Sequence, residues 1–353
     1  MRHLEAGGEE ALIELRGVTK RFGEFTIRNV DLKVEEGEYF IIMGPTGSGK
    51  TLLLQLIAGI YRPDRGRIII GGEDVTDKPP ERRGVGYVPQ NYALFRNMSV
   101  YDNIAYGLRV RGLRGWEVKR RVEEVAEVLD IKHLLKREVH GLSGGEQQRI
   151  ALARALVVGF KVMLLDEPLS ALDPYTSKRL RGFLREVHER FSSTTIHVTH
   201  DFDEAYELGD RVAVMRSGEI EQVGKPSEVV ESPLSLFVAE FVGWDNIFKG
   251  KAEKGAVKVY GLGVLGNLLG HWAGGSEVYV AFRAEDVEVT NDEGLAMGVV
   301  ESVSVRGLLC EASIRVGDLV VKARRPLSEL RCSVGEKVWI NIPKSRIKVF
   351  PST

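Results

Sequence analysis

The sequence predicts an α/β domain followed by a smaller all-β domain. Over the first two thirds of the 353 residues, short apolar runs alternate with helical patterns, which is typical of a mostly parallel sheet covered by helices. After residues 241–243 the pattern changes to short β-like runs separated by Gly and Pro, without a long helical period. The length also favours two domains, because a single hydrophobic core rarely grows far beyond about 250 residues.

Composition narrows the class of protein. The chain is 43% hydrophobic and 28% charged, as in ordinary globular proteins, and its formal net charge of −1 points to no nucleic-acid partner. No apolar run approaches the roughly 20 residues that cross a bilayer, and the polar N-terminus lacks the pattern of a signal peptide. We therefore expect a cytoplasmic protein with a flexible tail over residues 1–10. Cys310 and Cys332 form no CxxC pair, so free thiols are expected rather than a disulfide.

The first domain is expected over residues 11–242, with a helical subdomain over about residues 91–159. A helix is expected at Lys50–Ala58, ended by Gly59. The helical subdomain should contain an amphipathic helix, because apolar residues recur there at spacings of four, three and four: Val118, Val122, Val125 and Leu129. Strands are expected at Leu12–Leu15, Thr26–Val34, Glu38–Met43, Arg67–Ile70, Val162–Leu165, Thr194–Val198 and Arg211–Met215.

The second domain is expected over residues 243–353. Its short runs predict a small β-barrel or sandwich. From Ile247 onward Lys and Arg outnumber Asp and Glu, whereas the front part is slightly acidic. The expected strands are Glu277–Phe282, Gly298–Val305, Leu309–Val316, Leu319–Ala323, Lys337–Ile342 and Arg346–Phe350.

A phosphate-binding loop follows the strand that ends at Met43. Its glycines let backbone N–H groups converge on phosphate oxygens, and the positive end of the next helix points at the same anion. Lys50 is expected on the β- and γ-phosphates, and the Thr51 hydroxyl on Mg²⁺. By itself the motif fits a kinase or a GTPase equally well. The residues that match G-x-x-x-x-G-K-[ST] are Gly44, Pro45, Thr46, Gly47, Ser48, Gly49, Lys50 and Thr51.

A second anion-binding helix terminus is expected at Leu142–Glu146. Ser143 and Glu146 have the spacing of a capping box, which caps the following helix. However, Gly144 and Gly145 in the first turn cost about 1 kcal/mol each in helix stability. Such a cost is reasonable where the backbone must approach an anion closely.

Two carboxylates, Asp166 and Glu167, end the apolar strand that begins at Val162. A continuously apolar strand of this kind is typical of a buried parallel sheet, and ligands gather at the carboxyl ends of such strands. A metal or catalytic role is therefore expected for this pair.

These motifs, in this order, make residues 12 to 242 resemble the ABC ATPase family, whose signature motif is similar to LSGGQ. Glu146 stands where many members have Gln. The resemblance implies a P-loop ABC ATPase fold and the cofactors ATP and Mg²⁺. It implies that Asp166 holds Mg²⁺, that Glu167 is the general base for the attacking water, and that Gln90 contacts both Mg²⁺ and this water.

The resemblance also implies roles for residues outside the phosphate loop. Asp173 lies in the D-loop, which crosses between subunits, and His200 resembles the switch histidine that contacts the γ-phosphate. The neighbouring His197 is expected to be structural. Phe22 stands at the position of the aromatic that stacks on adenine, and Phe25 is the competing candidate.

Members of the family bind two ATP molecules between two subunits, so the resemblance implies a homodimer. Each ATP would lie between the phosphate loop of one copy and Ser143, Gly144, Gly145 and Glu146 of the other. An apolar cluster resembles the groove that receives a cytoplasmic helix of an integral membrane permease, with core packing as the alternative: Tyr92, Leu94, Phe95 and Met98.

The β-rich tail is similar to the OB/MOP-like regulatory barrel of importer ATPases. Leu52, directly after Thr51, and two segments, 241–247 and 306–330, look most like the molybdate/tungstate importer ATPases. Sulfate, sugar, polyamine and iron importers are the alternatives. A soluble ABC protein of DNA repair or translation is the alternative class, but the long coiled-coil insertion and the tandem ATPase units of those proteins are not seen.

An importer ATPase would lie peripherally on the inner face of the cell membrane and would serve an extracytoplasmic substrate-binding protein indirectly. If the cargo is an oxyanion, the basic tail is a candidate feedback sensor. The candidate anion ligands are Arg306, Lys322, Arg324 and Arg325.

Overall fold

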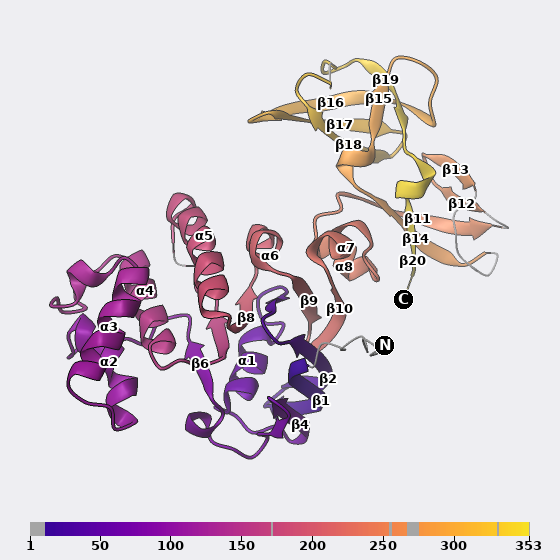
Figure 1. Ribbon diagram of the computed structural model, residues 1–353. Coiled ribbons are helices and arrows are strands. Elements are labelled where there is room, and N and C mark those ends of the chain that lie inside the picture. The colour runs from indigo at the N-terminus through magenta and orange to yellow at the C-terminus, as the bar shows by residue number, and fades with distance from the viewer. Residues whose placement is uncertain (1–10, 171, 254–255, 267–274, 330–331, 353) are drawn as a thin grey trace, which may run out of the picture. The chain divides into compact units, whose positions relative to one another are not determined.

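The computed structural model describes residues 11–170, 172–253, 256–266, 275–329 and 332–352 (Figure 1). The tail expected over residues 1–10 lies outside them. The chain divides into two compact units, residues 1–232 and 233–353. The expected boundary lay later, between residues 242 and 243. Helix α8 (Leu236–Phe241) belongs to the second unit because it packs against β14 in a small apolar cluster around Trp244.

A six-stranded sheet with the order β10-β9-β3-β8-β7-β6 forms the centre of the first unit. Its pairings are parallel except for that of β9 with β10. Strands β3 and β7 are buried at every position, as expected for strands covered on both faces. The carboxyl ends of β3, β7 and β8 therefore meet at one edge of the sheet. The strands are β3 (Tyr39–Met43), β6 (Val85–Val88), β7 (Val162–Asp166), β8 (Thr194–Thr199), β9 (Arg211–Arg216) and β10 (Glu219–Gly224).

A four-stranded antiparallel sheet with the order β2-β1-β4-β5 completes the β structure of this unit. Side chains from both sheets and from α1 (Lys50–Ala58) form one apolar core. Helix α1 ends at Gly59, as predicted, where φ is +85°. The strands are β1 (Ala11–Phe22), β2 (Phe25–Glu35), β4 (Arg65–Ile70) and β5 (Glu73–Asp74).

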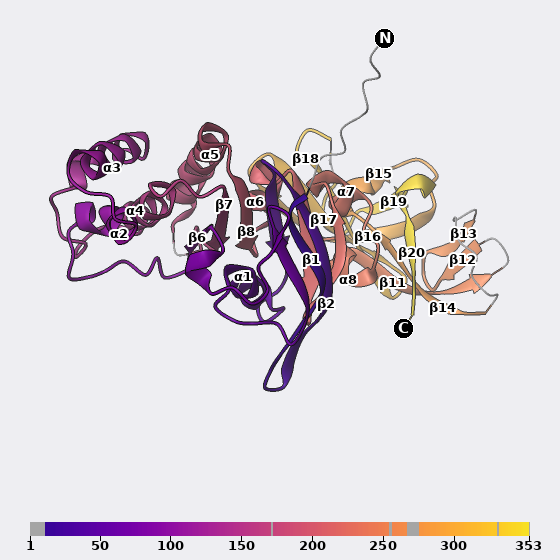
Figure 2. The same cartoon turned by 60° about the horizontal axis from the view of Figure 1, so that its bottom comes forward.

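The helical insertion lies between β6 and β7 in the chain. Its helices α2 (Val100–Val110), α3 (Trp116–Val128) and α4 (Gly144–Leu156) pack against one another (Figures 1 and 2). The amphipathic face predicted on α3 is buried. The remaining helices of this unit are α5 (Pro174–Phe191), α6 (Phe202–Leu208) and α7 (Pro226–Glu231). None of the helices in the described part of the chain is both long and apolar enough to span a bilayer.

The second unit contains two five-stranded antiparallel sheets, with the orders β13-β12-β11-β14-β20 and β15-β19-β16-β17-β18. Both sheets contribute to one apolar core, so the expected β-rich domain is confirmed. Its ladders form two open sheets, which is closer to a sandwich than to a closed barrel. Cys310 is buried, Cys332 is partly buried, and both are free. The strands are β11 (Asn246–Glu253), β12 (Ala256–Val259), β13 (Gly263–Gly266), β14 (Glu277–Phe282), β15 (Glu288–Thr290), β16 (Ala296–Arg306), β17 (Leu309–Val316), β18 (Leu319–Pro326), β19 (Lys337–Asn341) and β20 (Lys348–Pro351).

Candidate functional site

The phosphate-binding loop connects β3 to α1. Gly47 and Gly49 adopt φ values of +81° and +101°, which glycine accommodates without strain. A Cβ on Gly44 would collide with the main-chain oxygen of Met215, so only glycine fits there. The Ser48 hydroxyl is buried and has no hydrogen-bond partner among the described residues. A glycine cradle with an unsatisfied buried hydroxyl fits the binding of a phosphate group.

The Lys50 ammonium group lies over this loop. Its Nζ donates to the main-chain oxygens of Gly44, at 2.8 Å, and Pro45, at 3.0 Å, and the residue is only 5% exposed. Burial lowers the pKa of Lys50, and the carboxylates of Glu167 and Asp166 partly offset this effect. The loop thus holds a desolvated cation beside the backbone that would bind an anion.

The Asp166 carboxylate, at the end of β7, accepts two hydrogen bonds. Thr51 Oγ1 donates to its Oδ1 at 2.7 Å, and the Tyr87 hydroxyl donates to its Oδ2 at 3.1 Å. Burial raises the pKa of Asp166, while the two donors oppose that shift. A hydroxyl and a carboxylate are hard oxygen ligands of the kind that Mg²⁺ uses together with substrate phosphates. Within the described ranges no group of three or more His, Cys, Asp and Glu forms a separate metal site.

Tyr87 is a contact that sequence reasoning missed. It lies on β6, which pairs in parallel with β7 so that Tyr87 is opposite Leu164. The sequence predicts β7, but it carries no signal that tells which strand lies beside it.

The structure brings Glu167, Gln90 and His200 together. Gln90 Nε2 donates to Glu167 Oε2 at 3.2 Å, and His200 Nδ1 lies 3.6 Å from the same oxygen. Glu167 has a left-handed φ of 45°, and its N–H donates to the Val198 oxygen of β8 at 2.9 Å. Such a backbone costs about 1–3 kcal/mol and tends to occur at functional sites. His197, in contrast, is fully buried and contacts Tyr39 and Glu204, as expected for a structural histidine.

Gln90, Glu167 and His200 line one pocket of about 610 Å³. Phe25, the competing aromatic candidate, lines it, whereas Phe22 does not and packs edge-on against Tyr61 at 5.0 Å between ring centroids. The lining residues are Phe25, Thr46, Gly47, Gly49, Lys50, Thr51, Leu52, Gln90, Glu167 and His200.

The Ser143 hydroxyl caps α4 and forms the predicted capping box. It accepts from the Glu146 N–H at 3.3 Å, while the Ser143 N–H donates to Glu146 Oε2 at 2.7 Å and holds the pKa of Glu146 below its ordinary value. A Cβ on Gly144 would lie 3.0 Å from the Leu172 side chain, so close packing is a second reason for glycine there. Asp173 caps α5 by accepting from two backbone N–H groups. None of these capping residues lines the pocket.

The apolar cluster expected after Gln90 is divided in the structure. Tyr92 is buried, and Leu94 lines a polar groove near the start of α4. Phe95 is the one member of the expected cluster that lines an apolar groove of about 340 Å³, beside Tyr106, Val110 and other residues of the helical insertion.

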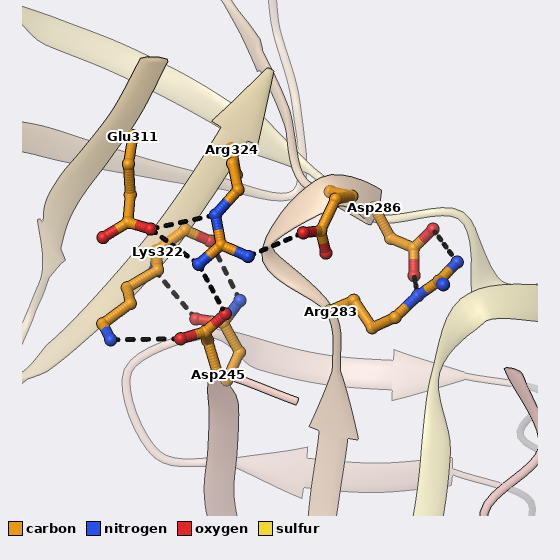
Figure 3. Close-up of polar contacts among 8 residues, drawn as sticks. Asp245, Arg283, Asp286, Glu311, Lys322 and Arg324 are labelled. Atoms are coloured by element: carbon orange, nitrogen blue, oxygen red, sulfur yellow. Dashed lines mark hydrogen bonds and ion pairs between the residues drawn. The ribbon is translucent and has the colours of Figure 1, made fainter. Parts of the chain in front are cut away.

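In the second unit, the structure argues against two of the four candidate anion ligands. Arg324 donates to Glu311, at 2.7 Å, and to Asp245, at 3.1 Å, and Lys322 also pairs with Asp245 at 3.1 Å (Figure 3). Arg324 makes a further ion pair with Glu285 at 2.7 Å. Burial opposes protonation, but these carboxylates raise the pKa of Arg324. An oxyanion placed there would face three carboxylates, which outnumber the two cations.

The other two candidates lie in different settings. Arg325 donates to the main-chain oxygen of Val287 at 3.3 Å, and Arg306 is exposed at the end of β16. Two of the four cations that suggested a sensor are therefore used in internal ion pairs.

Comparisons with known proteins agree with this geometry. A family model described as "ABC transporter" matches residues 27–170. The molybdate/tungstate import ATP-binding protein WtpC of Pyrococcus horikoshii is 44% identical over 349 residues, which is 96% of this chain and 100% of that protein. The sulfate/thiosulfate import ATP-binding protein CysA of Nitrosomonas europaea is 48% identical over 69% of this chain and 68% of that protein.

A solved structure shares the fold of part of this chain. The structure of cbiO1 from Clostridium perfringens, described as part of an ABC transporter complex, has a TM-score of 0.58 and 30% identity, and the match covers 63% of this chain and 91% of that one. The chain therefore belongs to the ABC transporter ATP-binding proteins, and it is the ATP-hydrolysing subunit of an importer.

Proposed function

We propose that two copies of this chain bind two ATP molecules with Mg²⁺ and power the import of molybdate or tungstate. The observation that carries the ATPase part is the convergence of Lys50, Thr51 and the Gln90–Glu167–His200 group on one pocket. Asp166 lies directly behind Thr51, whose hydroxyl donates to it. Phosphoryl transfer to water depends mainly on positioning and charge neutralisation, and this pocket contains groups for both.

Each group has a separate role in the proposed reaction. The glycine loop and Lys50 bind the β- and γ-phosphates. On binding, the Lys50 ammonium group gives up its hydrogen bonds to the loop carbonyls and donates to phosphate oxygens instead. Thr51 and Asp166, with Gln90, would hold Mg²⁺, and the bound ion would supply neutralisation of charge on the phosphate oxygens. Glu167 accepts a proton from the attacking water on one Oε atom as the water oxygen bonds to the γ-phosphorus. The bond between that phosphorus and the oxygen bridging it to the β-phosphate breaks in the same step, and ADP leaves with that oxygen.

Gln90 and His200 would act on either side of Glu167. The Gln90 amide donates to the Glu167 carboxylate and orients it toward the water. The His200 ring is exposed on the pocket side, where it can donate to a γ-phosphate oxygen. For adenine, we propose Phe22 as the stacking partner because it stands at the family position, while Phe25 packs over Gly49.

The homodimer is proposed because Ser143, Gly144 and Gly145 form a capped, positive helix terminus that does not line the pocket of its own chain. A second copy would bring this terminus, Glu146 and the D-loop Asp173 to the open side of the nucleotide. Both halves of a complete site are then supplied by one sequence.

The proposed membrane partner is an integral permease, which would place the ATPase at the inner face of the membrane. The apolar groove with Phe95, Tyr106 and Val110 fits an amphipathic permease helix, because these three side chains are exposed large hydrophobic groups beside it. An extracytoplasmic binding protein would deliver the cargo to that permease.

The cargo proposal is supported by the relative named for molybdate/tungstate import, whose match extends over 96% of the chain and so includes the β-rich unit. Another sulfate/thiosulfate relative matches 87% of the chain at 43% identity, and a relative named for Fe(3+) ion import matches 96% at 37%, so the preference for molybdate or tungstate rests on the higher identity of 44% over the longer match.

The test is reconstitution of the full-length chain in liposomes with its permease and binding protein. ATP hydrolysis should rise when the binding protein is loaded with tungstate or molybdate, and sulfate should give no such rise. Stimulation by sulfate, iron, a polyamine or a sugar instead would overturn the cargo proposal. One copy of the chain per assembled transporter would overturn the homodimer.

A further inference from the structure

The segment that follows Gln90 has an unusual backbone. Tyr92 and Ala93 are consecutive non-glycine residues with left-handed φ values of 60° and 45°. A left-handed conformation is sparsely populated for such residues and persists only where the surrounding structure holds it. The segment therefore needs a partner that stabilises this shape.

Arg154, near the end of α4, is that partner. Its Nη1 donates to the Ala93 oxygen at 2.6 Å and its Nη2 donates to the Tyr92 oxygen at 2.9 Å. The guanidinium carbon also lies 5.2 Å from the centroid of the Phe95 ring. A planar fork with several donors suits two adjacent carbonyls in a way that a lysine does not.

The held segment connects directly to the reacting groups. The Tyr92 hydroxyl donates to the Pro168 oxygen at 3.4 Å, one residue after Glu167, and Gln90 donates to the Glu167 carboxylate at 3.2 Å. A change in the backbone at residues 92 and 93 would therefore move the Gln90 side chain relative to Glu167.

We propose that Arg154 is a positioning residue for ATP hydrolysis, which acts by holding the Tyr92–Ala93 backbone so that Gln90 meets Glu167. The inference rests on the role proposed above for Gln90. Arg154 itself contacts neither the phosphate loop nor Glu167 in the hydrogen bonds of the described residues.

Arg149 is a matched control on the same helix. Its guanidinium also donates to a main-chain oxygen, that of Leu129 at 3.2 Å, and lies 5.1 Å from the Phe183 ring. It thus resembles Arg154 in chemistry and setting but holds a segment that is not joined to Gln90.

The experiment is a double-mutant cycle in the full-length chain, with kcat for phosphate release and the dissociation constant of a fluorescent ATP analogue as readouts. Arg154→Met keeps the apolar stem and removes both donors. It should lower kcat by about 10- to 100-fold, the scale of a small misplacement of reacting groups, with the ATP dissociation constant unchanged. In a Gln90→Ala background the same substitution should change kcat less than about 3-fold, because residues that act as one unit are not additive.

Arg149→Met should leave kcat close to wild type. The inference fails if Arg154→Met slows the Gln90→Ala protein as much as the wild type, or if Arg149→Met is equally slow. If Arg154→Met does not fold, Arg154→Lys, which keeps the charge but not the fork, takes its place and should show the same non-additivity. A wild-type kcat for Gln90→Ala would remove the proposed role of Gln90, whereas a slow Gln90→Ala beside a normal Arg154→Met removes only the role of Arg154.

Discussion

Replacing Glu167 with Gln is the sharpest test of the proposed chemistry, because the change is nearly isosteric. The amide oxygen of Gln still accepts the hydrogen bond that Gln90 now donates at 3.2 Å, so the shape of the site is retained. The side chain is only 20% exposed, and Gln takes up the same volume without a charge. What is lost is the basic oxygen that accepts a proton from the attacking water.

The expected magnitude follows from that single loss. General-base assistance contributes roughly 10²–10⁴ in rate. This range corresponds to about 2.7–5.5 kcal/mol of activation free energy. The substitution also removes one of the two carboxylates that keep the pKa of Lys50 from falling further, but Asp166 remains. ATP binding through the phosphate loop should therefore survive.

The assay measures phosphate release at saturating ATP and, separately, binding of ATP at equilibrium. Glu167→Gln should bind ATP and turn over at a small fraction of the wild-type rate. A surface carboxylate that does not line the pocket, Glu219, which pairs with Arg28, supplies the control, and Glu219→Gln should have wild-type kcat. Near-normal turnover by Glu167→Gln would remove Glu167 from the proposed role.

Three further outcomes are expected. Phe22→Ala should weaken ATP binding by about 2- to 12-fold, the equivalent of roughly 0.5–1.5 kcal/mol of stacking, and by more than Phe25→Ala; the reverse order in a binding titration would reassign the adenine partner. Asn246→Ala, which removes two hydrogen bonds to the β18 backbone from a fully buried amide, should destabilise the β-rich unit by about 2–4 kcal/mol in urea unfolding, and a loss below 1 kcal/mol would contradict this. The Ser143 N–H lowers the pKa of Glu146, so the ionised Glu146 carboxylate stabilises the folded protein. This contribution to folding stability is present above the ordinary pKa of about 4.5 and is lost as pH falls through the folded-state pKa. The difference in unfolding midpoint between wild type and Glu146→Gln should shrink in acid, and a difference that grows there would refute this sign.

Several local features follow from short sequence patterns. The phosphate loop, α1 with its end at Gly59, and the capping box of Ser143 and Glu146 all lie where the sequence predicts them. Each depends on contacts between residues close in the chain: glycine conformations, N–H groups of a first helical turn, and an apolar strand before them. Such features are set largely by the local backbone, so a single sequence reveals them.

Other features depend on which distant segments lie side by side. The Tyr87 hydroxyl reaches Asp166 because β6 lies next to β7, and Arg154 reaches the Tyr92 oxygen because α4 packs near the segment after β6. No local sequence pattern indicates that either pair of segments lies side by side. The same holds for Asp245, whose carboxylate pairs with cations of β18 that the sequence suggested as anion ligands.

The sequence alone thus determined the residues of the phosphate loop, because these are residue types at fixed spacings along the chain. The type of protein followed from the family resemblance that the ordered motifs carry. Tertiary structure decided how the charges are used. Lys50 is buried over the loop. Gln90, Glu167 and His200 lie together although they belong to three separate segments. Lys322 and Arg324 lie against carboxylates. The physical reason is that burial and Coulomb attraction depend on distances in space, which composition and spacing along a chain do not record.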